Sequence, residues 1–126
     1  MQNFYLNLIC IGFGEQFFDS LTIENLRFHR KGDIWRKRTG QKYKDNIAKL
    51  SLPVDTDNGY GATFDHLKEM VESEITLLAL LQDSREIEVQ FSASLDDENH
   101  MPHLHLTVQQ IEFLLKINAE IDIHIS

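Results

Sequence analysis

The sequence of 126 residues contains one cysteine, two prolines and six glycines. The single cysteine, Cys10, cannot form a disulfide within the chain, and its apolar surroundings predict a small buried side chain rather than a reactive thiol. Because proline and glycine are scarce, no stretch is typical of a flexible linker. A chain of this length holds one hydrophobic core, so we expect residues 1–126 to form a single domain.

Long hydrophobic runs are also missing. No segment approaches the roughly 20 apolar residues that a membrane-spanning helix needs. The first twenty residues contain no lysine or arginine, whereas a secretory signal begins with basic residues. We therefore expect a cytoplasmic protein that has no membrane partner.

Charge is abundant but unevenly distributed. The formal net charge is −8, yet residues 27–49 contain nine basic side chains and only two acidic ones. The remainder of the chain, residues 50–126 above all, is strongly acidic. Net acidity opposes non-specific binding to nucleic acids and membranes, because both surfaces are rich in phosphate. The nine basic side chains of residues 27–49 are the one feature that opposes this conclusion.

The spacing of apolar residues predicts most of the secondary structure. Residues 3–13 have the composition of a strand that is buried on both faces and central in its sheet. Residues 21–37 and 41–53 are predicted to be extended and to place the basic side chains on one exposed ribbon. Residues 64–82 form one apolar stripe at helical spacing, with Thr63 as the expected cap. Residues 86–95 alternate strictly between polar and apolar, which indicates a strand with one buried face.

The last third of the chain adds a helix and a strand. Thr107 and Gln110 match the capping box that starts a helix, and residues 120–126 alternate again. We therefore predict an α+β fold: a mainly antiparallel sheet of about five strands with two helices packed on one face. If the two alternating strands are oriented alike, the other face carries an acidic surface, formed by Glu86, Glu88, Glu120 and Asp122, with His124 beside it.

Motifs for catalysis are weak. His103 and His105 would share one strand face near His100, and neutral imidazole is a common zinc ligand, but a metal site needs three or four converging ligands. Exposed or capping histidines are the simpler interpretation. Carboxylates such as Glu86 and Glu88 are expected on an exposed face, which leaves them with ordinary pKa values. The sequence contains no phosphate loop, nucleophile motif or CxxC pair. We expect no enzyme activity, no metal and no cofactor.

The basic segment, residues 27–44, interleaves cations with aromatic side chains over residues 27–38. Single-stranded nucleic acids are bound by this mixture, because cations contact phosphates and rings stack on bases. The other interpretation is a solvated hairpin in which Phe28 and Trp35 face the core and the cations pair with acidic groups. The candidate nucleic-acid-binding residues are Arg27, Arg30, Lys31, Trp35, Arg36, Lys37 and Arg38.

The chain resembles a bacterial family of small, uncharacterised α+β proteins. The resemblance rests on the apolar first strand, the tract Arg30-Lys31-Gly32-Asp33 with Trp35, and the ending Leu106-Thr107…Leu114…Ala119-Glu120-Ile121-Asp122-Ile123. The second extended segment departs from the threonine-containing helical start that is usual in that family. The family implies a fold but no catalytic residues.

The overall profile also resembles the immunity proteins of contact-dependent growth inhibition and related bacterial toxin systems. Such proteins are small and acidic, and they neutralise toxin domains that are often basic nucleases. This resemblance implies a cognate toxin domain as the partner, because an acidic surface speeds association with a basic protein. The partner-binding residues would be Glu86, Glu88, Asp96, Asp97, Glu98, Glu120 and Asp122. The alternative is a nucleic-acid-binding or regulatory module that uses the basic segment.

Overall fold

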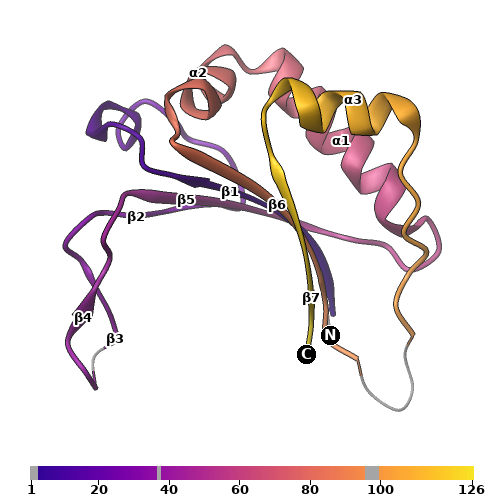
Figure 1. Ribbon diagram of the computed structural model, residues 1–126, viewed down its shortest axis with the longest axis horizontal. Helices are drawn as coiled ribbons and strands as arrows, with labels where there is room; N and C mark the ends of the chain where they lie inside the picture. Colours follow the sequence, from indigo (N-terminus) through magenta and orange to yellow (C-terminus); the bar gives the residue numbers. More distant parts are fainter. Residues whose placement is uncertain (1–2, 37, 96–99) are drawn as a thin grey trace.

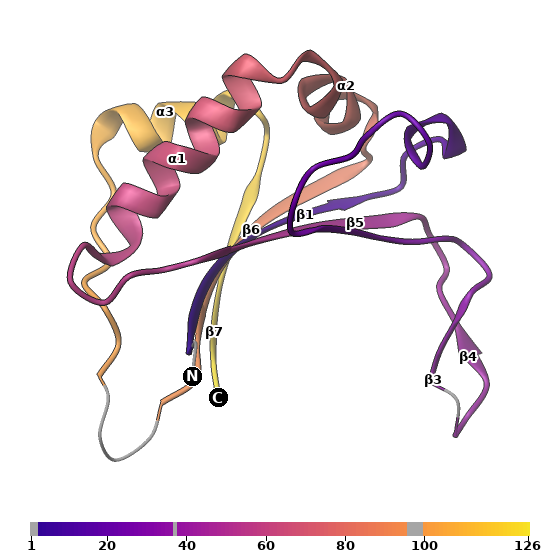
Figure 2. The ribbon, with the colours of Figure 1, turned by 180° about the vertical axis from the view of Figure 1, so that it is seen from behind.

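The computed structural model describes residues 3–36, 38–95 and 100–126, which form a twisted sheet covered on one face by helices (Figure 1). The sheet has the strand order β2-β5-β1-β6-β7. Its strands are β1 (Phe4–Ile11), β2 (Leu26–His29), β5 (Ile47–Pro53), β6 (Glu86–Ala93) and β7 (Glu120–Ile125). The covering layer contains α1 (Gly59–Ser73), α2 (Ile75–Asp83) and α3 (Val108–Lys116). From behind, α1 crosses obliquely above the sheet (Figure 2).

The core lies between the sheet and the helices. Alternate residues of β1 and β6, such as Leu8 and Phe91, point toward the helices and are fully buried. Phe91 stacks on Phe64 of α1 with ring centroids 6.3 Å apart. The hydroxyl of Tyr60 donates a hydrogen bond of 2.8 Å to the backbone oxygen of Ser92, which ties the start of α1 to β6. The central position of β1 confirms one part of the prediction, but the strand is not buried on both faces, because Tyr5 and Ile9 are only half-buried on the side without helices.

The predicted sheet needs a correction, because it is mixed rather than antiparallel throughout. β1 pairs antiparallel with β5 and with β6, and β2 pairs antiparallel with β5. β7, however, runs parallel to β6. Between these two strands the chain passes through α3, and such a crossover returns it to the end of the sheet at which β6 began. A strand, a helix and a strand in sequence should therefore have predicted a parallel pair.

The helical layer also differs from the prediction. The helix expected over residues 64–82 begins earlier, at Gly59, so Thr63 is not its cap, and it is broken at Glu74 into α1 and α2. Glu74 has an extended backbone (φ −102°, ψ 100°). A continuous helix would direct Ile75 toward the core, whereas after the break Ile75 is 84% exposed and Leu77 is fully buried. With α3, the described residues contain three α-helices rather than two.

The helix α3 starts as the sequence predicts. The side chain of Thr107 accepts a hydrogen bond from the backbone N–H of Gln110, and the Gln110 side chain accepts one from the backbone N–H of Thr107. Two shorter elements complete the description: a 3₁₀ turn over Glu15–Phe17 and a small hairpin of β3 (Ile34–Arg36) and β4 (Gln41–Lys42). In the described part of the chain, no helix is both long and apolar enough to cross a membrane.

A concave, charge-divided sheet face

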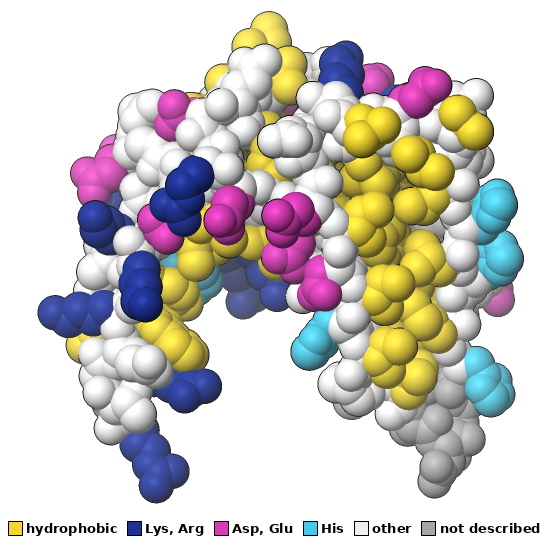
Figure 3. All heavy atoms as spheres, viewed as in Figure 1, with side chains coloured by type: hydrophobic (Ala, Val, Ile, Leu, Met, Phe, Trp, Pro, Cys, Tyr) yellow, Lys and Arg dark blue, Asp and Glu magenta, His cyan; other side chains and the backbone are white. Residues whose placement is uncertain are grey.

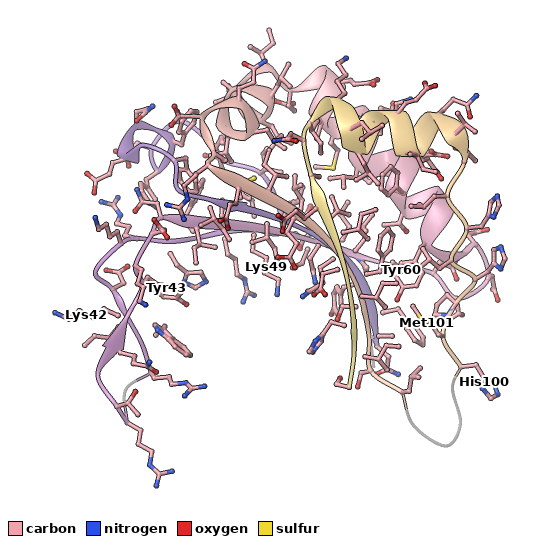
Figure 4. All side chains as sticks on the ribbon, viewed as in Figure 1. Lys42, Tyr43, Lys49, Tyr60, His100 and Met101 are labelled. Carbon is pink, nitrogen blue, oxygen red and sulfur yellow. The ribbon has the colours of Figure 1, made fainter. Side chains whose placement is uncertain are left out.

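The face of the sheet that the helices leave uncovered is the candidate functional site. The β3–β4 hairpin extends downward at one end of this face and the ends of β6 and β7 descend at the other, so the molecule has the shape of an arch (Figures 1 and 2). The space-filling view shows the hollow beneath the arch (Figure 3). We call this surface the open face. Lys49 of β5 points down into the hollow (Figure 4).

One end of the open face is acidic. The register of β6 and β7 pairs Glu88 with Glu120 and Gln90 with Asp122, so the side chains of these four residues share one face of the sheet. Glu86 lies two residues before Glu88 on the same face of β6. Acidic side chains gather here beside β7 (Figure 3). We call Glu86, Glu88, Glu120 and Asp122 the acidic cluster.

The environment of Glu88 corrects the expectation that these carboxylates have ordinary pKa values. Partial burial raises the pKa of Glu88, and the negative charge of the neighbouring Asp122 raises it further. Within the described residues, no lysine or arginine forms an ion pair with the acidic cluster, and the salt bridge that is present joins Arg85 to Asp45 elsewhere. The acidic cluster is therefore crowded, and Arg85, which the charge of the adjacent Glu86 attracts, forms its salt bridge with Asp45 instead.

Four candidate residues lie outside the described residues. These are Asp96, Asp97 and Glu98 of the acidic set and Lys37 of the basic set.

The middle of the open face is polar, and the sequence analysis did not single it out. Asn7 of β1 donates a 2.9 Å hydrogen bond to the side chain of Gln90 and is only 3% exposed. Two adjoining hollows of about 710 and 340 Å³ share Tyr5, Lys49 and Ser51 in their walls. The alternation of Ala48, Leu50 and Leu52 with Ile47, Lys49 and Ser51 is the signal that marks β5 as half-exposed.

The other end of the open face is basic and aromatic. Arg27 and His29 of β2 stand opposite Lys49 and Ile47 of β5. The ring of His29 stacks on Tyr43 with centroids 4.7 Å apart, and Trp35 lies 6.4 Å beyond Tyr43. We call His29, Tyr43 and Trp35 the aromatic row. It connects the sheet to the hairpin, where lysines and arginines crowd the surface (Figure 3).

The hairpin only partly fits the interpretation of a solvated ribbon with its aromatic rings in the core. Phe28 does pack against core residues, but Trp35 is 43% exposed. The guanidinium of Arg36 lies 4.4 Å from the Trp35 ring centroid, a cation–π contact. Asp45, just after the segment, bonds Arg85 with two contacts of 3.0 Å, and no described cation of residues 27–44 forms a salt bridge. The expected neutralisation of the cations is therefore largely absent there.

The other predicted cations are spread along the segment. Arg30 stacks over the ring of Phe18 at 4.4 Å, which holds it against the 3₁₀ turn. The backbone N–H of Lys31 donates to the side chain of Asn46, which fixes the base of the hairpin. Arg38 is exposed in the β3–β4 turn. Of the candidates that the structure describes, Arg27, Trp35 and Arg36 are thus placed on or beside the aromatic row.

The histidines do not form a metal centre in the residues that the structure describes. His103 and His105 are exposed and stack with ring centroids 5.9 Å apart. No third ligand joins them within residues 3–36, 38–95 and 100–126, where no cluster of three or more metal-binding side chains occurs. His124 lies instead on the open face, in the wall of the smaller hollow.

Comparison with known proteins gives one match. A family model described as "Domain of unknown function (DUF4279)" matches residues 15–126. The chain belongs to this family. The part of the DUF4279 chain that matches includes the acidic cluster and the aromatic row, together with every described element except β1. No curated protein and no solved structure matches the chain.

Proposed function

We propose that this DUF4279 protein binds another protein through the open face, and that it acts as an immunity protein that neutralises a basic, nuclease-type toxin domain. The acidic cluster carries the proposal. Four carboxylates share one end of a concave surface, and none of them forms a salt bridge with a lysine or arginine among the described residues. Like charges placed opposite each other on a sheet destabilise it. A basic partner relieves that repulsion, so the arrangement favours binding over stability.

The charge division of the face gives the complex its orientation. Acidic residues lie on β6 and β7, and basic residues lie on β2, β5 and the hairpin. A partner whose surface carries the reverse pattern meets attraction at both ends in only one orientation. Complementary charge of this kind speeds encounter and suppresses wrong partners. A toxin domain bound in the hollow of the arch would have its own active site covered. This is stoichiometric inhibition, which needs neither catalysis nor a cofactor.

The experiment begins with affinity purification of the tagged protein from its native bacterium and mass spectrometry of whatever is retained. The partner's domain is then expressed in a host cell alone, with the wild-type DUF4279 protein, and with the double variant Glu88→Lys, Asp122→Lys. We expect the domain to be toxic alone, harmless with the wild-type protein, and toxic again with the double variant. The control is Glu24→Lys, which changes charge in an exposed turn outside the sheet.

Two outcomes would contradict the proposal. A partner that is harmless when expressed alone excludes the immunity function while leaving a binding function. A double variant that binds with the wild-type association rate at low salt, where charge effects are strongest, excludes the acidic cluster as the contact surface.

A second function is supported by a different observation. Because Trp35 is exposed and continues the aromatic row, the hairpin presents rings and cations together, as surfaces for single-stranded nucleic acid do. We test it by titrating labelled single-stranded DNA and RNA in low salt. Loss of binding in Trp35→Ala, with retention in Lys116→Ala, which removes a cation from α3 instead, would support this function. The absence of any signal with the wild-type protein would exclude it.

A further inference from the structure

The strand β7 lies at an edge of the sheet and presents unpaired backbone groups. In the strand order it has β6 on one side, and no described strand pairs with it on the other. The backbone N–H of Ser126 donates a hydrogen bond to the carbonyl oxygen of Ala93, and the carbonyl of Ser126 accepts one from the N–H of Leu95. The backbone N–H and C=O groups of the even-numbered residues of this strand therefore point toward β6. The alternate residues, Ile121, Ile123 and Ile125, therefore direct their N–H and C=O groups outward. Such an edge is a template for another strand.

The edge has neither the lysine nor the proline that often protects one, and its two carboxylates, Glu120 and Asp122, lie on the open face. Residues 120–126 contain no lysine, arginine, proline or glycine. On the helix side of the sheet, Ile121, Ile123 and Ile125 are each more than half exposed. Hydrophobic side chains form a continuous band along β7 and beside α3 (Figure 3), and α3 contributes Val108, Ile111 and Leu115 to the exposed apolar surface. Contiguous apolar surface beside a free strand edge is typical of a protein interface.

The sequence of β7 is complementary to itself when two copies run antiparallel. Outward-facing residues must oppose outward-facing residues, which limits the possible registers. If Ile123 opposes Ile123 of a second copy, then Ile121 opposes Ile125, and the two strands overlap over residues 120–126. On the open face, Asp122 then opposes His124 of the other copy. A shift by two residues in one direction sets Asp122 against Asp122, and in the other direction it sets His124 against His124. The register with the longest overlap is therefore also the one with complementary side chains.

We infer that the protein forms a two-fold symmetric dimer by antiparallel pairing of β7 with β7 of a second copy, with Ile123 on the axis. The two sheets become one continuous sheet of ten strands. The axis is perpendicular to this sheet, so both open faces lie on the same side and both helical layers on the other. The six isoleucines of the two edges pack next to one another on the helical side, where each is otherwise exposed to water.

Sedimentation of the full chain tests the inference. At about 100 µM, high enough to populate even a weak dimer, we expect the wild-type protein to sediment at twice its 14.7 kDa mass. Ile123→Arg places two guanidinium groups opposite each other on the axis, and we expect this variant to be monomeric. The matched control is Ile75→Arg, the same change at an exposed isoleucine of α2, which should remain dimeric. Circular dichroism of both variants shows whether the fold is retained.

Cysteine cross-linking tests the register. Opposed residues of a hydrogen-bonded antiparallel pair have Cα atoms about 5.5 Å apart, within the range of a disulfide. Ile123→Cys should therefore form a covalent dimer on oxidation. Ile121→Cys should not, because its two copies would lie about 14 Å apart along the strands. The native Cys10 is only 2% exposed and does not compete.

These results distinguish between the possible binding partners of the β7 edge. A wild-type protein that stays monomeric at this concentration overturns the inference and leaves the edge to a strand of a different protein. A dimer that survives Ile123→Arg, or that cross-links through position 121 and not 123, assigns the interface to another surface or another register. The open face is not altered by these variants, so the outcome is independent of the function proposed above.

Discussion

Replacing Glu88 by glutamine should stabilise the protein at neutral pH. Glu88 lies opposite Glu120 on the neighbouring strand, and Glu86 and Asp122 share the same face. Partial burial and the charge of Asp122 raise the pKa of Glu88 above its usual value of 4.5. The folded protein therefore holds the Glu88 proton more tightly than the unfolded chain does. This group contributes its full stability below pH 4.5, and the contribution is lost as the pH rises through the raised pKa.

The magnitude follows from the geometry of the acidic cluster. A pair of like charges directly opposite each other on a sheet, as Glu88 and Glu120 are, costs about 0.2–1 kcal/mol, and the diagonal Asp122 and the same-strand Glu86 add smaller repulsions. With three acidic neighbours, Glu88→Gln should raise the free energy of unfolding by about 1 kcal/mol at pH 7. For a chain of this size that corresponds to a rise in Tm of about 4 °C.

Urea unfolding at pH 7 and near pH 4, followed by circular dichroism, measures the effect. The difference between Glu88→Gln and wild type should be positive at pH 7 and should shrink at pH 4, where Glu88 becomes protonated in the folded wild type. Glu24→Gln, which makes the same change in net charge in an exposed turn, controls for the overall charge of the molecule. A Glu88→Gln protein no more stable than wild type at pH 7, or a gain undiminished in acid, would refute the reasoning.

Three further predictions concern the fold. At Gly59 the backbone has φ +71° and an added Cβ would lie 2.9 Å from the His103 carbonyl oxygen, whereas at Gly32, with φ +93°, it would meet nothing. Gly32→Ala should therefore lower the free energy of unfolding by about 1 kcal/mol, and Gly59→Ala should lower it clearly more. Chemical denaturation measures both values, and equal losses would contradict the close approach at Gly59. Thr107→Ala should lower stability by about 1 kcal/mol and Thr107→Ser by much less, because only alanine removes the capping oxygen. Burial raises the pKa of Cys10 to about 12, so the native thiol should resist alkylation at pH 8 and react only on unfolding in urea; rapid labelling of the folded protein would disprove its burial.

Local patterns in the sequence were sufficient for the elements whose side chains alternate or repeat regularly. The strands β6 and β7 and the capped start of α3 follow from period-two alternation and from Thr107 with Gln110, and the structure has all three. The break at Glu74 was not predictable in this way. Ile75 continues the apolar spacing of α1, and only packing against the sheet favours burying Leu77 instead. Tertiary contacts override the local pattern at that point.

The candidate site was predicted only in part, for a similar reason. The acidic cluster was foreseen because its residues alternate within two strands, and their shared face follows from the register. The aromatic row was not foreseen, because His29 and Tyr43 are separated by the hairpin and meet only after β2 pairs with β5. The sequence indicated a hairpin in this region but not the register that brings the two rings together. Lys49 and the polar middle of the open face were missed for the same cause.

The two surfaces proposed for binding occupy different sides of the same strand and are therefore compatible. Even-numbered side chains of β7 belong to the open face, and the isoleucines between them belong to the helical side and direct their backbone groups to the edge. Edge pairing leaves every side chain on the face where it already lies. A dimer would bring two acidic clusters to the same side of one sheet, and their combined field would attract a basic protein more strongly than one cluster does. Ile123→Arg should accordingly slow association with such a partner at low salt more than Ile75→Arg does, although neither substitution touches the open face. Equal association rates would separate dimer formation from partner binding.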